Sequence, residues 1–166
     1  MDIKIASIKK LKYILKDIDC SSTGAVLCSS YPIQKEWFQK LYSFISFEFD
    51  DVLKSSSSAF NNNIANDIKN YVENVSRKIE TLYICCDSGE SRSSALAAAT
   101  IKYMNGNDDE IWNNPLYHPN PLVYKIQCNA YGINVSEFKV RRLVRANNLA
   151  LKKAIKKSAI KNKKKG

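Results

Sequence analysis

Short apolar runs alternate along the chain with longer segments in which apolar residues recur at helical spacing. Four runs are rich in β-branched or aromatic residues, or are bounded by turn residues, and are predicted to be strands. A six-residue series spaced for one face of a helix predicts an amphipathic helix of about four turns. The strands are predicted at 3–7, 24–29, 44–49 and 81–85, and the helical series is Ile64, Ile68, Tyr71, Val72, Val75 and Ile79.

The remaining segments complete an alternation of strands and helices. A strongly helical segment, 93–104, ends at an Asn-Gly pair that is typical of a helix C-terminus. A Ser/Asn cluster at 55–63 predicts a loop. Two further helices are expected, 121–131 and 136–150. The segment 8–18 reads as a helix or a continuation of the first strand, and 34–42 as a helix or a helical turn.

This order predicts an α/β fold with a central, mostly parallel sheet and helices on both faces. With 166 residues the chain is long enough for one domain with a sizeable core. We expect that domain to span residues 1–150. Residues 151–166 are expected to form a basic tail, flexible or helical.

The charge is concentrated at one end of the chain. Twelve of the 26 Lys and Arg residues lie after residue 138, where no Asp or Glu occurs, while the preceding part carries 14 basic and 16 acidic residues. Such a basic end is compatible with a solvated tail, a nucleic-acid arm or a patch for anionic surfaces. The sequence therefore predicts, as the simplest case, solubility with weak contact to polyanions.

Cysteine usage indicates a reducing compartment. Five scattered cysteines, two of them adjacent, make a poor disulfide framework, so a cytoplasmic location is expected. Without a CxxC pair, and with a single histidine, a structural zinc site is not expected. The chain has no leader-like apolar run at its N-terminus and no apolar stretch long enough for a membrane span.

The sequence CDSGESRSS, residues 86–94, carries the clearest chemical signal. The strand predicted at 81–85 runs directly into Cys86, small turn residues follow, and a helix begins after Arg92. The unpaired N–H groups and positive end of a helix N-terminus make such a loop an anion cradle. The backbone N–H groups of residues 87–92 (Asp87, Ser88, Gly89, Glu90, Ser91 and Arg92) are therefore predicted to bind phosphate.

Individual side chains of this loop have predicted roles. Arg92 offers a fixed fork of donors to two phosphate oxygens. Cys86 at the mouth of the cradle should have a lowered pKa and act as a nucleophile. Ser93 is placed to donate to its sulfur, and Gly89 lets the backbone curl around the anion. Carboxylates inside the cradle repel phosphate unless they face outward, so Asp87 and Glu90 receive no side-chain chemistry.

These residues resemble the signature His-Cys-x2-Gly-x2-Arg-[Ser/Thr] of the Cys-dependent protein tyrosine and dual-specificity phosphatases. The chain is more narrowly similar to small predicted bacterial members, which also share FDDV at 49–52 and PNPLVY at 119–124. The resemblance implies hydrolysis of phosphomonoesters through a cysteinyl-phosphate intermediate, with no metal or cofactor. The sequence departs from the signature at Cys85, where the family has a His that orients the loop and tunes the thiol.

The mechanism also requires a general acid to protonate the leaving oxygen and later activate water. The resemblance places this acid on a loop some thirty residues before the nucleophile, where Asp50 and Asp51 lie. Strand alternation favours Asp51, although both carboxylates could simply cap a turn. His118 is expected to be a surface residue. Asn120 is expected either to brace the phosphate loop or to cap the helix that begins at Pro121.

Three alternatives remain open at this point. The expected substrate is phosphotyrosine or phosphoserine/threonine in a protein, but the same fold can act on RNA 5′-phosphates or phosphoinositides attracted by the basic tail. The missing His also leaves open a non-catalytic phosphate-binding module. Finally, the thiol of Cys85 beside Cys86 suggests redox protection of the nucleophile, or else Cys85 is only the last core residue of its strand.

Overall fold

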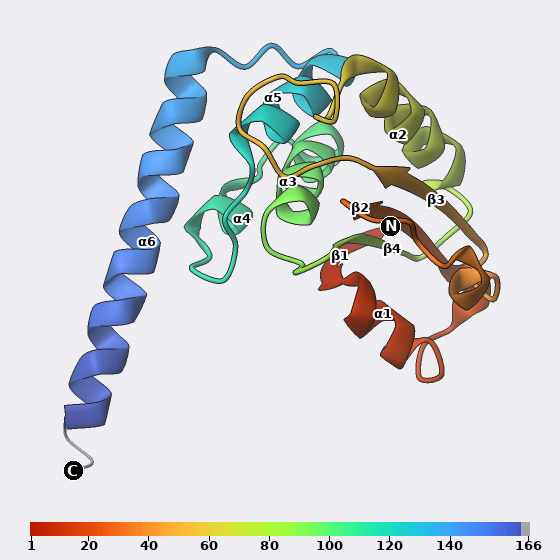
Figure 1. Ribbon diagram of the computed structural model, residues 1–166, viewed down its shortest axis with the longest axis horizontal. Coiled ribbons are helices and arrows are strands. Elements are labelled where there is room, and N and C mark those ends of the chain that lie inside the picture. The colour runs from red at the N-terminus through yellow and green to blue at the C-terminus, as the bar shows by residue number, and fades with distance from the viewer. Residues whose placement is uncertain (164–166) are drawn as a thin grey trace.

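A computed structural model describes residues 1–163 of the chain. Its core is one four-stranded sheet in the order β1-β4-β2-β3, with every neighbouring pair parallel. Helices lie on both sides of this sheet (Figure 1). The predicted α/β class and the four predicted strands are therefore confirmed. The strands are β1 (Asp2–Ser7), β2 (Thr23–Ser29), β3 (Ser43–Glu48) and β4 (Thr81–Cys86).

The two middle strands are the most buried. All of β2 is buried, and so are five of the six residues of β4. A parallel strand that is covered on both faces has a continuous apolar sequence and not an alternation of apolar and polar residues. Both middle strands could therefore be predicted from their apolar runs. Because all four strands run the same way, their carboxyl ends share one edge, where ligands bind in open α/β sheets.

Alternate residues of β4 face two separate cores. Leu82, Ile84 and Cys86 belong to the larger core, under α2 (Asn62–Val75), α3 (Arg92–Asn105) and α5 (Pro121–Ala130). Tyr83 and Cys85 face the smaller core, which α1 (Ile8–Ile14) and the 3-10 helix η2 (Lys35–Phe38) cover. Successive side chains of β4 therefore point to opposite faces of the sheet and into different cores.

Several element ends differ from the sequence prediction. Helix α1 ends four residues early, at Ile14, and the 3-10 helix η1 (Cys20–Ser22) follows, where the Asp19 carboxylate accepts hydrogen bonds from the Ser21 N–H and hydroxyl. Helix α2 begins two residues early, because Asn61 caps it by accepting from the N–H groups of Asn63 and Ile64. The segment predicted at 34–42 contains only η2. Helix α4 (Asp109–Asn113) was not predicted.

Helix α6 (Glu137–Lys163) is much longer than the predicted 136–150. Its first half packs on the body through Val140 and Leu143, and the Asn147 side chain donates to the carbonyl oxygens of Trp112 and Tyr117. Beyond this contact the helix extends away from the body (Figure 1). The tail predicted from residue 151 is thus helical up to Lys163, and residues 164–166 lie outside the described part.

Candidate active site

The loop from Cys86 to Ser91 joins the middle strand β4 to the N-terminus of α3. Gly89 has a φ of 81°, a left-handed conformation that favours glycine. A Cβ on Gly89 would lie 2.6 Å from the Ser7 nitrogen and 2.7 Å from the Ala6 carbonyl carbon. The backbone of β1 therefore packs directly under the loop, and only glycine fits this turn without a shift.

The sulfur of Cys86 is surrounded by donors of its own loop. It lies 3.1 Å from the Ser93 hydroxyl oxygen and accepts a hydrogen bond from the Gly89 N–H at 3.2 Å. Burial alone raises the pKa of the Cys86 thiol, but the Ser93 hydroxyl and the N–H groups of Ser93, Gly89 and Glu90 outweigh it. The net effect is a lowered pKa, because each of these donors stabilises the thiolate.

Arg92, the first residue of α3, is 4% exposed and tightly held. Its Nη1 donates to the Phe49 carbonyl oxygen at 2.6 Å and to the Ser30 hydroxyl at 3.0 Å. Its Nη2 donates to an Asp87 carboxylate oxygen at 2.5 Å. Its Nε is buried and has no hydrogen-bond partner. A buried guanidinium donor without a partner is costly, which makes this atom a candidate for binding a ligand.

Asp87, to which the sequence analysis assigned no side-chain chemistry, forms an ion pair with Arg92. Besides the ion pair with Arg92, its carboxylate accepts from the Ser29 hydroxyl at 2.7 Å and from the Ser30 N–H at 3.3 Å. Burial opposes ionisation, but these donors together with the Arg92 charge lower the pKa of Asp87. The carboxylate thus holds the guanidinium from the side of β2.

Ser29, Ser30 and the Phe49 carbonyl were not identified from the sequence. They lie at or just beyond the ends of β2 and β3, while the loop follows β4. The strand order would have identified them, because β2 lies between β4 and β3 and all three strands end at the same edge of the sheet. That order is a long-range property that local patterns do not contain.

Of the two candidate acids, Asp51 lies against the loop. One of its carboxylate oxygens accepts from the Ser91 hydroxyl at 2.9 Å and from the Asn120 side-chain nitrogen at 2.7 Å. Its side chain is exposed, so it remains open to a substrate. Asp50 instead pairs through its backbone, donating its N–H to the Ser58 carbonyl and bridging Ala59.

Asn120 combines both roles that were considered for it. Its side-chain oxygen accepts from the Leu122 and Val123 N–H groups and caps α5, while its side-chain nitrogen donates to Asp51. Its backbone N–H donates to the Ser91 carbonyl at 3.3 Å. His118 is exposed, and its backbone N–H donates to the Glu90 carbonyl. The segment before α5 therefore supports the phosphate loop mainly through its backbone and Asn120.

Cys85 lies on the opposite face of the sheet from Cys86. Its side chain is fully buried in the core under α1, beside Leu27 and Leu11. Burial strongly raises the pKa of the Cys85 thiol, and the neighbouring Cys86 adds to this effect. This position agrees with a core residue and separates the two adjacent thiols.

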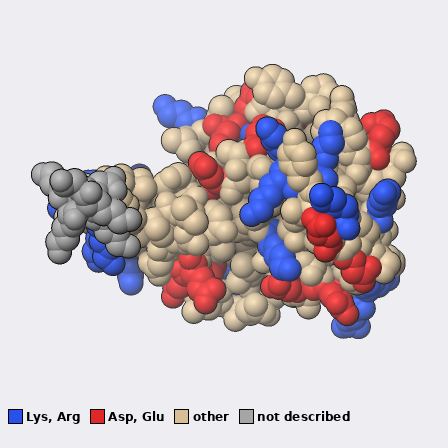
Figure 2. Space-filling model, turned by 90° about the horizontal axis from the view of Figure 1, so that it is seen from below, with Lys and Arg blue, Asp and Glu red and all other residues tan. Residues whose placement is uncertain are grey.

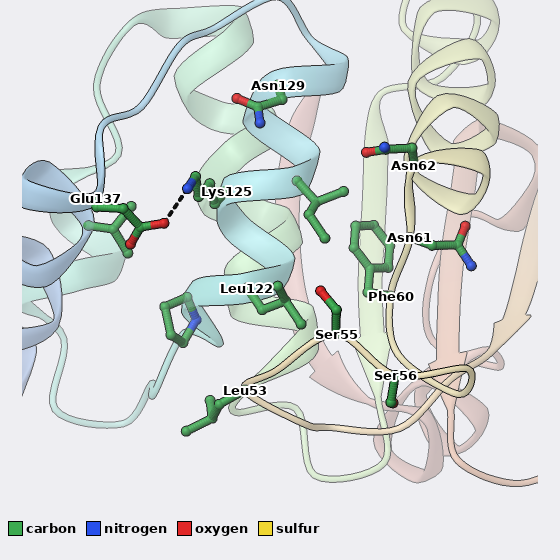
Figure 3. A pocket seen from close by; sticks show the side chains of 13 residues that line it. Leu53, Ser55, Ser56, Phe60, Asn61, Asn62, Leu122, Lys125, Asn129 and Glu137 are labelled. Carbon is green, nitrogen blue, oxygen red and sulfur yellow. Dashed lines mark hydrogen bonds and ion pairs between the residues drawn. The ribbon is translucent and has the colours of Figure 1, made fainter.

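A cavity of about 590 Å³ lies next to the acid loop, between residues 53–62 and α5 (Figure 3). Polar groups of Ser55, Asn62 and Asn129 line it, and its two charged residues, Lys125 and Glu137, are paired with each other. None of residues 86–92 lines this cavity. The Cys86 sulfur and the Arg92 guanidinium, which the sequence predicts to act on phosphate, lie instead at the Cys86–Ser91 loop and the first residue of α3.

Residues 1–163 offer neither a cluster of metal ligands nor a membrane-spanning helix. Within this range no group of three or more His, Cys, Asp and Glu side chains could hold a metal ion. No helix in the same range has both the length and the apolar character needed to cross a membrane.

The sheet order, the loop after β4 and the flanking helices give the chain the fold of the protein tyrosine phosphatases, as its resemblance to them implied. A form of P. aeruginosa TpbA solved in complex with pTyr superposes with a TM-score of 0.50 at 11% identity, over 89% of this chain and 86% of that one. Tk-PTP in its active form gives 0.46 at 15% identity, over 88% and 90%. PTPMT1 in complex with PI(5)P gives 0.42 at 12% identity, over 92% and 94%.

Sequence comparisons add nothing to this likeness. No family model matches the chain. No curated protein matches it either. The structural likeness, at such low identity, establishes the fold, and the activity has to be argued from the residues of the loop.

Proposed function

We propose that the chain is a Cys-dependent phosphatase that hydrolyses phosphomonoesters through a cysteinyl-phosphate intermediate. The observation that carries this proposal is the convergence of two groups on one loop. The Cys86 sulfur accepts from the Gly89 N–H and lies next to the Ser93 hydroxyl, and the buried Arg92 Nε lacks a partner. A phosphoryl group in the loop would satisfy Nε and lie in front of the thiolate.

In the first step the Cys86 thiolate attacks phosphorus. The S–P bond forms as the P–O bond to the leaving group breaks, and Asp51 gives its proton to the departing oxygen. Arg92 and the loop N–H groups stabilise the negative charge on the equatorial oxygens. Asp51 is our choice over Asp50 because its carboxylate contacts Ser91 of the loop.

In the second step water replaces the sulfur. Asp51, now ionised, takes a proton from water as the new P–O bond forms, and the S–P bond breaks to return the thiolate. Ser93 stabilises this departing sulfur, because its hydroxyl oxygen lies 3.1 Å from Sγ. The products are inorganic phosphate and a free alcohol or phenol, and the protonation states of the enzyme are restored.

Phosphorylated side chains of proteins are the substrates that we propose. The rim of the loop is open, since Asp51 is exposed and Tyr31, next to the Arg92 contact Ser30, is 73% exposed. An open rim accommodates a phosphate that projects from a macromolecule. We test this class by comparing kcat/KM for phosphotyrosine and phosphoserine peptides with that for a 5′-phosphorylated RNA and a phosphoinositide.

The basic helix α6 could instead attract a polyanionic substrate such as RNA or a phosphoinositide. Figure 2 shows one face of the molecule, on which Lys and Arg side chains are mixed with acidic ones. If RNA or phosphoinositide were the better substrate, with steep salt dependence and loss on truncation after Leu151, the protein substrate class would be wrong.

The activity itself is tested with p-nitrophenyl phosphate. Wild type should turn over, and a quenched reaction should contain phosphate on Cys86 by mass spectrometry. Cys86→Ser and Arg92→Ala should lose turnover, whereas Cys128→Ser, a matched thiol substitution on α5 outside the loop, should retain it. Equal rates for wild type and Cys86→Ser, or binding of phosphate without turnover, would show that the loop is not catalytic.

A further inference from the structure

The second half of α6 carries four exposed lysines and no acidic residue. They form two pairs at a spacing of one helical turn, so Lys152 lies next to Lys156 and Lys153 next to Lys157. Like charges at this spacing destabilise a helix. None of the four forms an ion pair with an acidic side chain of residues 1–160. Negative charge supplied from outside the chain would therefore stabilise this half of the helix.

Two exposed apolar side chains lie among these lysines. Because a helix turns by about 100° per residue, Leu149 and Ile160 are only about 20° apart around the axis. By the same count, all four lysines lie within about 80° of Leu149. Leu149 and Ile160 are each 57% exposed, although water is a poor environment for them. We call these six residues the lysine face: Leu149, Lys152, Lys153, Lys156, Lys157 and Ile160.

The lysine face points away from the body. The first half of α6 packs on the body through Val140, Leu143 and Asn147. Counted around the axis, Lys156 lies about 180° from Asn147 and about 160° from Val140. The second half of the helix also extends beyond the body (Figure 1). A flat surface can therefore approach the lysine face along this half of the helix.

We propose that the lysine face of α6 binds the surface of a membrane that contains anionic phospholipids. Its lysines would contact the lipid phosphates, and Leu149 and Ile160 would enter the boundary between headgroups and acyl chains. In this mode the helix lies along the membrane surface and does not cross it. The inference does not depend on the proposed phosphatase activity.

The apolar side chains favour a lipid surface over a nucleic acid. Phosphates of RNA would contact the lysines equally well, but they offer no apolar environment to Leu149 and Ile160. The lysine face also contains no aromatic side chain on which a base could stack. A groove in an acidic protein would enclose more of the helix, yet Leu151 and Ala154 on its other side are already half-buried. A single exposed face of charged and apolar residues therefore fits a lipid surface best.

The test measures how the full-length protein sediments with phospholipid vesicles. We expect binding to vesicles of phosphatidylcholine mixed with phosphatidylglycerol, little binding to phosphatidylcholine alone, and weaker binding at high salt. The double variant Lys153→Gln/Lys156→Gln should bind at least about tenfold more weakly, since each lysine near an anionic surface contributes roughly a fivefold factor. The matched control is Lys9→Gln/Lys10→Gln, which removes two exposed lysines of α1 and should bind like wild type.

A second variant separates a lipid surface from other polyanions. Leu149→Gln/Ile160→Gln keeps every charge, so it should weaken vesicle binding but leave any binding of a single-stranded RNA unchanged. Leu116→Gln, at another exposed leucine, is its control and should have no effect. In wild type, anionic vesicles should slow hydrogen exchange of the backbone N–H groups of residues 150–160, because the lipid charge relieves the repulsion between lysines.

Three results would overturn the proposal. The first is equal binding to the two kinds of vesicle, or to neither. The second is an equal loss of vesicle binding in the α6 and α1 lysine variants, which would move the site away from α6. The third is tighter binding to RNA than to anionic vesicles, with no effect of Leu149→Gln/Ile160→Gln, which would make α6 a nucleic-acid arm. None of the substituted side chains belongs to a core, and if a variant still fails to fold, the comparison of the two kinds of vesicle with wild type decides.

Discussion

Removing the Asp87 carboxylate should weaken phosphate binding, although a negative charge is taken away from an anion site. The reason is the ion pair with Arg92, whose Nη2 donates to Asp87 at 2.5 Å while Nε remains unpaired. Without Asp87, we expect the guanidinium to rotate and to displace the unpaired Nε that we propose binds phosphate. Asp87→Asn keeps an acceptor oxygen for Nη2 and so separates positioning from charge.

The magnitude follows from the exposure of the pair. A hydrogen bond to a charged group is worth about 1.5–3 kcal/mol. The Arg92 side chain is 5% exposed but that of Asp87 is 42% exposed. Screening at the exposed partner reduces the expected loss to about 1–2 kcal/mol. This corresponds to roughly 5- to 30-fold weaker binding of phosphate or vanadate to Asp87→Ala.

The assay measures vanadate inhibition together with kcat and KM for p-nitrophenyl phosphate. Asp87→Ala should raise both the inhibition constant and KM, whereas Asp87→Asn should bind as tightly as wild type or more tightly. If Ala and Asn both bound vanadate more tightly by the same factor, repulsion would be the main effect of Asp87 and the positioning argument would be refuted.

The lowered pKa of Asp87 also predicts how the stability of the fold depends on pH. A carboxyl group with a lower pKa in the folded than in the unfolded state stabilises the fold fully above its unfolded pKa, about 3.9. That stabilisation is lost as the pH falls through the folded pKa. The stability difference between wild type and Asp87→Asn should therefore be constant near neutral pH and shrink below about pH 4.

Three further predictions concern the same loop. Asp51→Asn should lower kcat by about 10²–10⁴-fold, more for alkyl than for aryl phosphates, whereas Asp50→Asn should change kcat little. Equal losses in the two variants would contradict the choice of Asp51 as the acid. Ser93→Ala should raise the thiol pKa measured by iodoacetamide alkylation against pH, and an unchanged profile would contradict the role of its hydroxyl. In urea unfolding, Gly89→Ala should lower the free energy of unfolding by at least about 1 kcal/mol more than Gly106→Ala does. Both glycines have a positive φ, but of the two only Gly89 lacks room for a Cβ. Equal losses of stability would refute the close packing of the loop.

The phosphate loop was predictable because its determinants are contiguous. A strand, a Gly that allows a left-handed turn and a helix start follow one another within a few residues, and each leaves a local pattern. The expected acid could be placed at one of two neighbouring residues, Asp50 or Asp51, for the same reason, since both follow a recognisable strand. Which of the pair contacts the loop depends on Ser91 and Asn120, and such contacts became visible only in the structure.

Other features depend on chain segments that are distant in sequence. The contacts of Arg92 with Ser30 and the Phe49 carbonyl span 62 and 43 residues, and they depend on which strands are neighbours. Helix α4, with five residues, is too short to show periodicity. Helix α6 continues past the last apolar contact because no Gly or Pro interrupts the sequence before residue 166.

The position of Cys85 limits what a different residue there can do. Its side chain lies in the core under α1, on the face of the sheet opposite to the Cys86 sulfur. The donors that lower the pKa of Cys86 come instead from the loop backbone and Ser93. The phosphatase signature has a His at this position. A His side chain there would lie on the α1 face of the sheet, so we expect it to affect the loop through packing and backbone position and not by contacting the sulfur. The donors that lower the pKa of Cys86 are thus all supplied by the loop and the first turn of α3.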